Sequence, residues 1–501
     1  VIEGPILWRI LTFAFLLASI FYLAPALVDQ DVGWLLHSAS RLVEGAALYR
    51  DVIDPNPPGI FFLNLAPAWI ARLTGLAPTA VFKAYVILLT LLSLALCDRI
   101  LRRSLDSTLG RLRACLLVGL LALLLAGART PFGQREHLML VLILPYLFSA
   151  ASWAMGQPQG PRFSVLVGAL AGVAVSLKPY FLLVWLLIEG YLMLARGAQS
   201  AWTRRENWII ALAQLATGAY VILAAPEYYQ EIIPMARLVF SLGNVAPGYL
   251  LHNDAAQLWL AAVLAFFIIP PRSPLRELRR VAALAATAFL ASAVIQQKGF
   301  DYHYYQTWAG AFLLAMVVGL DLTLRIERAQ HWLWLLFLGA TAAVAVLLTQ
   351  AQPRPRHDDP IPPLIDVVAK HARGEPILVL SYGTYPAFPT VNYARARWPY
   401  RFSCLWMVQA FYAGAHPTPH GFPYRRPDEM PGLEKNAFDG MAADLLRAPP
   451  RLLMIHCATA SFDIMEYLAQ DPRVRALWRN YEELTTVQCI RILKRTGGAS
   501  S

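Results

Sequence analysis

The chain has 501 residues, of which 57% are hydrophobic and only 15% are charged. Soluble domains carry about 25% charged residues, so this composition excludes an ordinary soluble protein and predicts a polytopic helical membrane protein. The net charge of +11 does not indicate nucleic-acid binding. The arginines stand in short segments between apolar runs, where membrane topology and lipid headgroups account for them.

Eleven apolar runs predict transmembrane helices, because crossing the hydrocarbon core takes about 20 residues. No small-residue cleavage site follows the first run, so we expect it to remain as a helix rather than to act as a signal peptide. The segment 59–75 is shorter and contains a proline, which predicts an interfacial or re-entrant piece. The expected spans are residues 7–28, 78–97, 114–128, 137–155, 163–177, 180–196, 208–225, 255–270, 281–296, 304–322 and 332–350.

The arginines also predict the orientation, because cytoplasmic loops are enriched in Lys and Arg. With a cytoplasmic N-terminus, most arginines fall in cytoplasmic segments, including Arg99, Arg102, Arg103, Arg204, Arg276, Arg279 and Arg280. We therefore expect a bacterial inner-membrane protein. Its first outer loop is residues 29–77, and an odd number of spans sends the C-terminus to the periplasmic side.

Residues 351–501 predict a second domain of the α/β class, following a transmembrane domain of residues 1–350. The entry to this region is polar and rich in proline, and the runs 376–381 and 451–456 resemble strands bounded by turn residues. Its three cysteines, Cys404, Cys457 and Cys489, lack the spacing of a metal site. The sequence leaves open whether two of them form a disulfide.

Polar residues collect at the outer ends of the expected spans. Ionisable residues at membrane depth are costly, so they are candidates for a functional site. Carboxylates and cations together on the outer face suggest general-base chemistry on an anionic, lipid-linked substrate. The candidates are Asp29, Asp31, Asp51, Asp54, Arg129, Arg135, Glu136, His137, Lys178, Lys298, Asp301 and His303.

Each of the main candidates also has a structural interpretation. Asp31 is placed to cap the amphipathic helix expected over 33–45, and Asp54 precedes Pro55 in a typical turn. Lys178 is placed to reach lipid headgroups, and His303 lies in an aromatic segment typical of a membrane interface.

The first outer loop resembles that of the GT-C glycosyltransferases, the clan of protein O-mannosyltransferases and lipid A aminoarabinose transferases. The segments 171–181 and 298–314 are similar to the lysine-containing segments of these enzymes, and 132–147 occupies the place of their fourth helix. Asn56 stands where the family has a lysine. The residues that carry the resemblance in the loop are Asp31, Gly45, Tyr49, Asp51, Asp54, Pro57 and Pro58.

The resemblance implies inverting transfer of a sugar from a polyprenyl-phosphate donor to a glycan, glycolipid or protein of the cell envelope. It assigns the catalytic role to Asp31, and we expect Asp54 to be a second carboxylate. It places Lys178 and Lys298 at the donor phosphate, and we expect Arg135 or His303 to assist. Glu136, His137 and Tyr304 are further candidates, and no cofactor or metal is required by this scheme.

For the acceptor, the aromatic and arginine-rich run 388–406 nominates Trp398, Arg401 and Trp406. The alternative is that this run packs against the membrane domain. Three other functions stay open: a ligase that transfers a whole lipid-linked glycan, a transporter or flippase, and a non-catalytic scaffold. A transporter should show paired repeats with broken helices, whereas this chain places its charges on one face and appends a soluble domain.

Overall fold

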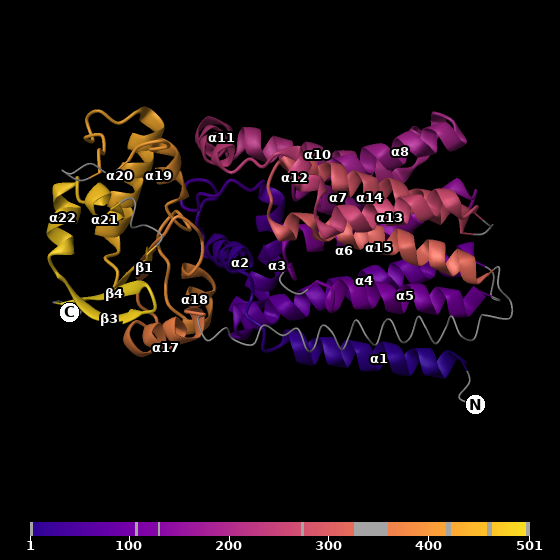
Figure 1. Ribbon diagram of the computed structural model, residues 1–501, viewed down its shortest axis with the longest axis horizontal. Helices are drawn as coiled ribbons and strands as arrows, with labels where there is room; N and C mark the ends of the chain where they lie inside the picture. The colour runs from indigo at the N-terminus through magenta and orange to yellow at the C-terminus, as the bar shows by residue number, and fades with distance from the viewer. Residues whose placement is uncertain are drawn as a thin grey trace.

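The computed structural model describes residues 4–105, 109–128, 131–271, 275–324, 359–416, 422–457 and 463–496. Long helices lie side by side in a bundle, a smaller domain stands at one end of it, and the N-terminus lies at the other end (Figure 1). By length and composition, six described helices are apolar enough to cross a membrane: Pro78–Ser104, Arg135–Ala154, Pro179–Arg196, Arg205–Leu223, Arg276–Gln296 and Asp301–Thr323. The prediction of a helical membrane protein is confirmed.

The predicted spans from 7–28 through 304–322 each coincide with a helix of the bundle. The predicted span 332–350 lies outside the described residues. The bundle helices are α1 (Gly4–Leu23), α4 (Pro78–Ser104), α5 (Gly110–Leu125), α6 (Arg135–Ala154), α7 (Pro161–Ser176), α8 (Leu182–Arg196, preceded by the turn η2, Pro179–Phe181), α10 (Arg205–Leu223), α13 (Asp254–Ile268), α14 (Arg276–Gln296) and α15 (Asp301–Thr323).

Prolines mark several helix starts, because a proline in the first turn lacks only an N–H that would be unpaired anyway. Pro58 and Pro78 begin α3 (Pro58–Thr74) and α4. The end of α3 is set by Gly75, whose φ of 70° suits glycine at a helix C-terminus. The segment 59–75, predicted to be interfacial or re-entrant, is thus one continuous helix with Pro67 inside it.

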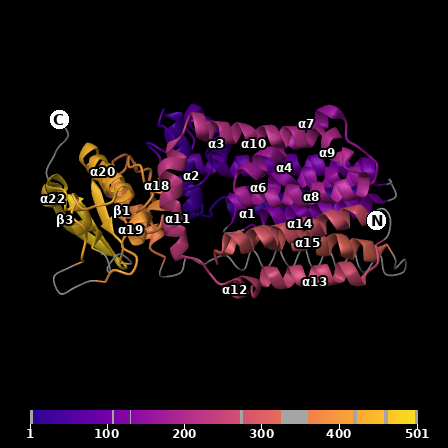
Figure 2. The same ribbon diagram turned by 90° about the horizontal axis from the view of Figure 1, so that it is seen from above.

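Shorter helices connect the bundle to the smaller domain. The predicted amphipathic helix after the first span is confirmed as α2 (Gln30–Val43). The sequence did not predict η3 (Tyr228–Ile232), α11 (Ile233–Leu242) or α12 (Pro247–Leu251), nor the short helix α9 (Gln199–Thr203) between α8 and α10. Seen from above, α2 and α11 lie between the bundle and the C-terminal domain (Figure 2). There α2 contacts α18 (Ala387–Ala394), and α11 contacts α19 (Trp406–Phe411).

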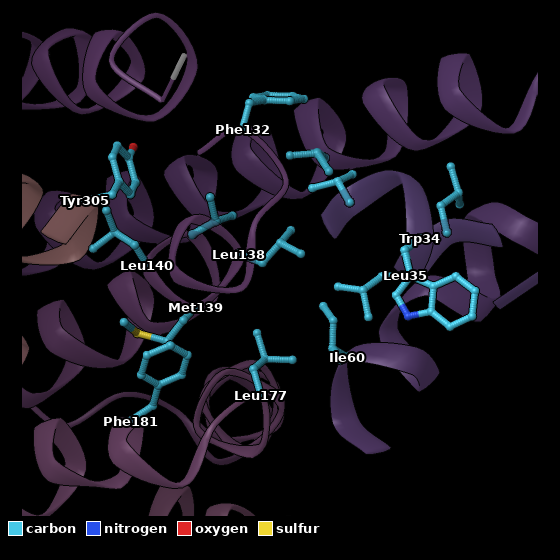
Figure 3. Close-up of a cluster of buried hydrophobic side chains, with 14 of the residues drawn as sticks. Trp34, Leu35, Ile60, Phe132, Leu138, Met139, Leu140, Leu177, Phe181 and Tyr305 are labelled. Carbon is cyan, nitrogen blue, oxygen red and sulfur yellow. The ribbon is translucent and has the colours of Figure 1, made fainter. Parts of the chain in front are cut away.

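A buried apolar cluster holds α2 and α3 onto the bundle. Trp34 and Leu35 from α2 face Ile60 from α3, Leu138 from α6 and Leu177 at the end of α7 (Figure 3). Each of these side chains is at most 2% exposed. This packing fixes the start of α2 beside the start of α6.

The C-terminal domain is α/β, as predicted. Its sheet has the order β1-β2-β4-β3, with β1 and β2 parallel and the other pairs antiparallel. The two runs predicted as strands form β1 and β2. The elements are α17 (Ile361–His371), β1 (Ile377–Leu380), α18 (Ala387–Ala394), α19 (Trp406–Phe411), α20 (Gly432–Arg447), β2 (Leu452–Ile455), α21 (Ile464–Leu468), α22 (Pro472–Trp478), β3 (Tyr481–Val487) and β4 (Ile490–Arg495).

The structure also decides the cysteine pairing that the sequence left open. Cys457, just after β2, is joined to Cys489 in the turn between β3 and β4. Cys404 is a buried free thiol.

Candidate active site

The ends of several helices meet where the bundle faces the C-terminal domain. Five residues that the sequence nominated come together there. Asp31 comes from the first turn of α2, Arg135 and Glu136 from the start of α6, Lys178 from the residue pair after α7, and His303 from the start of α15. Residues far apart in the sequence therefore form one charged cluster.

The carboxylate of Asp31 can contact a substrate because another residue caps its helix. The N-cap of α2 is Asp29, whose Oδ1 accepts from the backbone N–H of Asp31 at 2.9 Å. The same oxygen accepts from Nε2 of Gln134 at 2.5 Å. The carboxylate of Asp31 instead meets Nη2 of Arg135 at 3.2 Å and is 27% exposed, against 7% for the arginine side chain. The interpretation of Asp31 as the helix cap is thus wrong.

Asp54 lies deeper, with both carboxylate oxygens occupied. Its Oδ2 accepts from Nε1 of Trp34 at 2.7 Å, and its Oδ1 accepts from the backbone N–H and Nδ2 of Asn56, each at 2.7 Å. Burial raises the pKa of Asp54, and these hydrogen bonds oppose the rise. Arg135 donates to Oδ1 of Asn56. Asp54 is therefore linked to Arg135 through an amide.

Lys178 is embedded in a polar network. Its Nζ donates to Oε1 of Glu136 at 2.5 Å and to Oε1 of Gln296 at 3.2 Å, and it lies 3.2 Å from Nε2 of His303. The side chain of Glu136 is fully buried. The ring of Tyr302 faces both cations, with its centroid 5.7 Å from Nζ of Lys178 and 5.8 Å from Cζ of Arg135.

Arg135 and Glu136 each keep a polar atom with hydrogen-bonding capacity. Nε of Arg135 and Oε2 of Glu136 are buried and have no hydrogen-bond partner within the part of the chain that the structure describes. Buried polar atoms in folded proteins are nearly always paired, so such atoms at a charged cluster indicate room for a ligand or an ordered water.

Several other predicted site residues lie outside the cluster, and Arg129 lies outside the described residues. Nζ of Lys298 donates to the carbonyl of Phe240 and to Oδ1 of Asn244, which fastens the end of α11 to the turn before α15. His137 accepts from the N–H of Gly133 at 3.0 Å and is 2.7 Å from the carbonyl of Leu124, so its ring serves as a neutral buried connector. Tyr304 packs in a separate small apolar cluster with Leu250, Ala255 and Ala293.

The residues nominated for the acceptor make contacts within the protein. Trp398 is 1% exposed and donates from Nε1 to the carbonyl of Phe402 at 2.8 Å. Arg401 pairs with both oxygens of Asp444, each at 3.1 Å. Trp406 begins α19, the helix that contacts α11. Their role in acceptor binding stays a prediction, and these contacts fit the alternative of a packed surface.

Gln134, Gln296 and Tyr302 belong to the cluster although the sequence did not predict them, whereas Asp29 was placed on the outer face without a specific role. Each of the three stands within two residues of a predicted site residue in the sequence. Gln134 and Gln296 carry no charge, so a search for ionisable residues at span ends did not select them. Position at a span end was the feature that would have found them.

The closest approach to a metal-binding group among the described residues lies elsewhere, in the C-terminal domain. Potential ligand atoms of His456, Cys457 and Cys489 are within 4.8 Å of one another. The two sulfurs are bonded to each other in the disulfide, so this trio holds no thiolate for a metal.

Comparison with known proteins gives matches in structure alone. No protein-family model matches the chain, and no curated protein matches it in sequence. ArnT from Cupriavidus metallidurans, a GT-C superfamily protein, superposes on it in two crystal structures. With undecaprenyl phosphate bound, it aligns with a TM-score of 0.56 and 14% identity, and in the apo state with 0.58 and 12%. Both alignments cover 98% of each chain.

This chain has a GT-C fold. The archaeal oligosaccharyltransferase AglB from Archaeoglobus fulgidus, in complex with an inhibitory peptide and a dolichol-phosphate, aligns at 10% identity and a TM-score of 0.48. That alignment covers 96% of this chain and 73% of AglB. The GT-C fold predicted from the first outer loop is confirmed by the ArnT alignments, which include the C-terminal domain.

Proposed function

We propose that this protein is a membrane glycosyltransferase that moves a sugar from a polyprenyl-phosphate donor to a hydroxyl of a cell-envelope acceptor. The observation that carries the proposal is the position of the Asp31 carboxylate. It does not cap α2, because Asp29 does so. The carboxylate is partly exposed to solvent and stands beside a buried arginine where the helix ends meet. The GT-C fold and the undecaprenyl phosphate bound to ArnT support a lipid-linked donor.

In the proposed reaction Asp31 acts as the general base. Its carboxylate takes the proton of the acceptor hydroxyl, and the hydroxyl oxygen forms a bond to the anomeric carbon from the face opposite the phosphate. The bond between that carbon and the phosphate oxygen breaks, the sugar inverts, and the polyprenyl phosphate leaves with the bonding electrons.

The cations of the cluster would stabilise the leaving phosphate. Nε of Arg135 has no partner among the described residues, and Lys178 lies within the same network, so both are placed to offset the charge that develops on the departing oxygen. We assign His303 a supporting role beside Lys178. Asp54 acts through Asn56, by holding the side chain of Arg135 in position. Donor binding by Lys298 would require it to leave its contacts with α11.

We further propose that the cluster faces the outer side of the cytoplasmic membrane. The arginine-rich segments lie between the other ends of the helices, as the positive-inside rule requires for the cytoplasmic face. The disulfide between Cys457 and Cys489 supports an oxidising compartment for the C-terminal domain. Nucleotide sugars are absent there, so a lipid-linked donor is the available one.

The substitution Asp31→Asn tests the assignment. Loss of a general base lowers transfer by about 100- to 10,000-fold. The measurement is transfer of radiolabel from undecaprenyl-phosphate sugars to a membrane extract, with the purified full chain. Asp51→Asn is the matched control, because Asp51 lies in the same loop and its carboxylate accepts from the backbone N–H of Ala47, a contact that an asparagine keeps. That control should keep activity within a few-fold of wild type.

Near-normal transfer by a folded Asp31→Asn variant would contradict the role of Asp31. Uptake of labelled lipid into vesicles without transfer would instead support the transporter. Transfer of label only from a lipid-linked oligosaccharide, and not from a single lipid-linked sugar, would support the ligase.

A further inference from the structure

A second polar site lies between the two domains, away from Asp31. A groove of about 700 Å³ runs between the C-terminal half of α2, the turn from α3 to α4, and the segment after α18. Among its lining residues are four arginines and one acid: Arg41, Arg395, Arg397, Arg447 and Glu44. The groove is therefore basic.

Two of these arginines do not pair with an acidic side chain of the described residues. Arg395 and Arg397 are exposed, and no acidic partner faces either of them within the described ranges. The other two are held in place, because Arg41 donates to the carbonyl of Tyr400 at 2.7 Å and Arg447 pairs with Asp444 at 2.9 Å. Fixed and free guanidinium groups around one hollow suit a phosphate, which arginine binds through paired hydrogen bonds.

The opposite wall of the groove is largely apolar. It is formed by the turn Gly75 to Thr79, immediately before the spanning helix α4. Leu76 in this turn is 60% exposed, and Trp69 and Leu73 on the preceding helix are 47% and 76% exposed. Exposed apolar side chains at the end of a span face lipid. A molecule in the groove would thus touch arginines on one side and acyl chains on the other.

The groove is distinct from the candidate active site. Arg41 is ten residues beyond Asp31 on α2, which corresponds to about 15 Å along a helix that rises 1.5 Å per residue. None of the residues that contact Lys178 lines the groove.

We propose that this groove binds the phosphate-bearing headgroup of a membrane lipid, with the guanidinium groups of Arg395 and Arg397 on the phosphate and the acyl chains along Leu76. Such a lipid would bridge the membrane domain and the C-terminal domain at the bilayer surface. The proposal does not depend on the transfer reaction.

Lipid binding to the detergent-purified full chain, followed by native mass spectrometry, tests it. The probes are phosphatidylglycerol and phosphatidylcholine with the same acyl chains. We expect phosphatidylglycerol to bind at least about tenfold more tightly, and Arg395→Gln/Arg397→Gln to raise its Kd about tenfold or more, because each hydrogen bond between charged groups is worth about 1.5–3 kcal/mol. Arg475→Gln/Arg479→Gln is the matched control, with the same loss of charge on the far side of the domain and an unchanged Kd.

Two results would overturn the proposal. One is equal binding of the two lipids, or an unchanged Kd in the groove variant. The other is displacement of phosphatidylglycerol by an equal concentration of glycerol phosphate, which lacks acyl chains and would identify the ligand as a soluble phosphate. Thermal unfolding of all variants in the same detergent shows whether a change in binding reflects loss of fold.

Discussion

Asp29 and Asp31 are two residues apart, yet the fold gives them different environments. Asp29 turns its carboxylate inward to cap α2 and to accept from Gln134. Burial, and then the charge of Asp31, raises the pKa of Asp29 to about 6. An acid whose pKa is raised on folding favours the folded state while it is protonated and opposes folding once it is ionised. Stability therefore falls as the pH rises from the unfolded pKa of 3.8 to about 6.

This shift predicts that Asp29→Asn stabilises the protein at neutral pH. One pKa unit corresponds to about 1.4 kcal/mol, so the rise of the Asp29 pKa corresponds to about 3 kcal/mol above pH 6. Asparagine keeps the Oδ1 that accepts both hydrogen bonds and mimics the protonated acid. We expect a higher Tm for the variant at pH 8, with a smaller gain at pH 5. A gain that is equal at the two pH values, or a loss at pH 8, would contradict the raised pKa.

Asn56 joins two predicted site residues, Asp54 and Arg135, by hydrogen bonds. Its amide donates to Asp54 and accepts from Arg135. The lysine that the GT-C family has in this place offers no acceptor for an arginine. Through this amide, Asp54 holds the side chain of Arg135, which in turn pairs with Asp31.

At the scale of elements, the ion pair of Lys178 and Glu136 joins the end of α7 to the start of α6. Both side chains are at most 10% exposed. Removing one partner of a buried pair leaves an uncompensated charge and costs about 3–5 kcal/mol, whereas removing both is often nearly neutral.

We therefore expect Lys178→Gln to lower the free energy of unfolding by about 3–5 kcal/mol, and Lys178→Gln/Glu136→Gln to recover most of the loss. Lys435→Gln is the control, because its partner Asp439 lies in an exposed pair worth at most about 1 kcal/mol. Unfolding in one detergent, followed by tryptophan fluorescence, gives all three values. A double variant as unstable as the single one would show that packing, not charge, joins the helices.

Apolar runs predicted the long helices well because each had to bury its backbone hydrogen bonds within a single segment. The short helices α11 and α12 were missed because their 10 and 5 residues carry no sustained pattern. Arg204 and Arg279, counted with the cytoplasmic segments, are buried in ion pairs with Glu189 and Asp321. Charge at a span end thus did not predict exposure to solvent.

At the scale of the whole molecule, the C-terminal domain and the N-terminus stand at opposite ends of the bundle (Figure 1). This arrangement predicts opposite accessibility across the membrane. We expect a membrane-impermeant maleimide to label Arg479→Cys in intact spheroplasts, and to label Arg103→Cys only after lysis.

The wild-type chain serves as the background, because Cys97, Cys115 and Cys404 are buried and Cys457 is bonded to Cys489. Labelling of Arg103→Cys in intact spheroplasts, with protection of Arg479→Cys, would reverse the proposed orientation and place the candidate active site in the cytoplasm.

The sequence by itself determined the membrane class, the long helices, the strands β1 and β2 and the GT-C resemblance, since these depend on local composition and on motifs within one segment. It also nominated Asp31, Arg135 and Lys178. Only the tertiary structure decided that Asp29 rather than Asp31 caps α2, that Lys298 fastens α11, and that Cys457 pairs with Cys489. The contacts of Lys298 and of the cysteines depend on which helix ends and loops meet in space, and a contact between residues distant in the chain leaves no pattern in either segment alone. The cap of α2 is local, but the hydrogen bond from Gln134 to the Asp29 carboxylate comes from a distant segment.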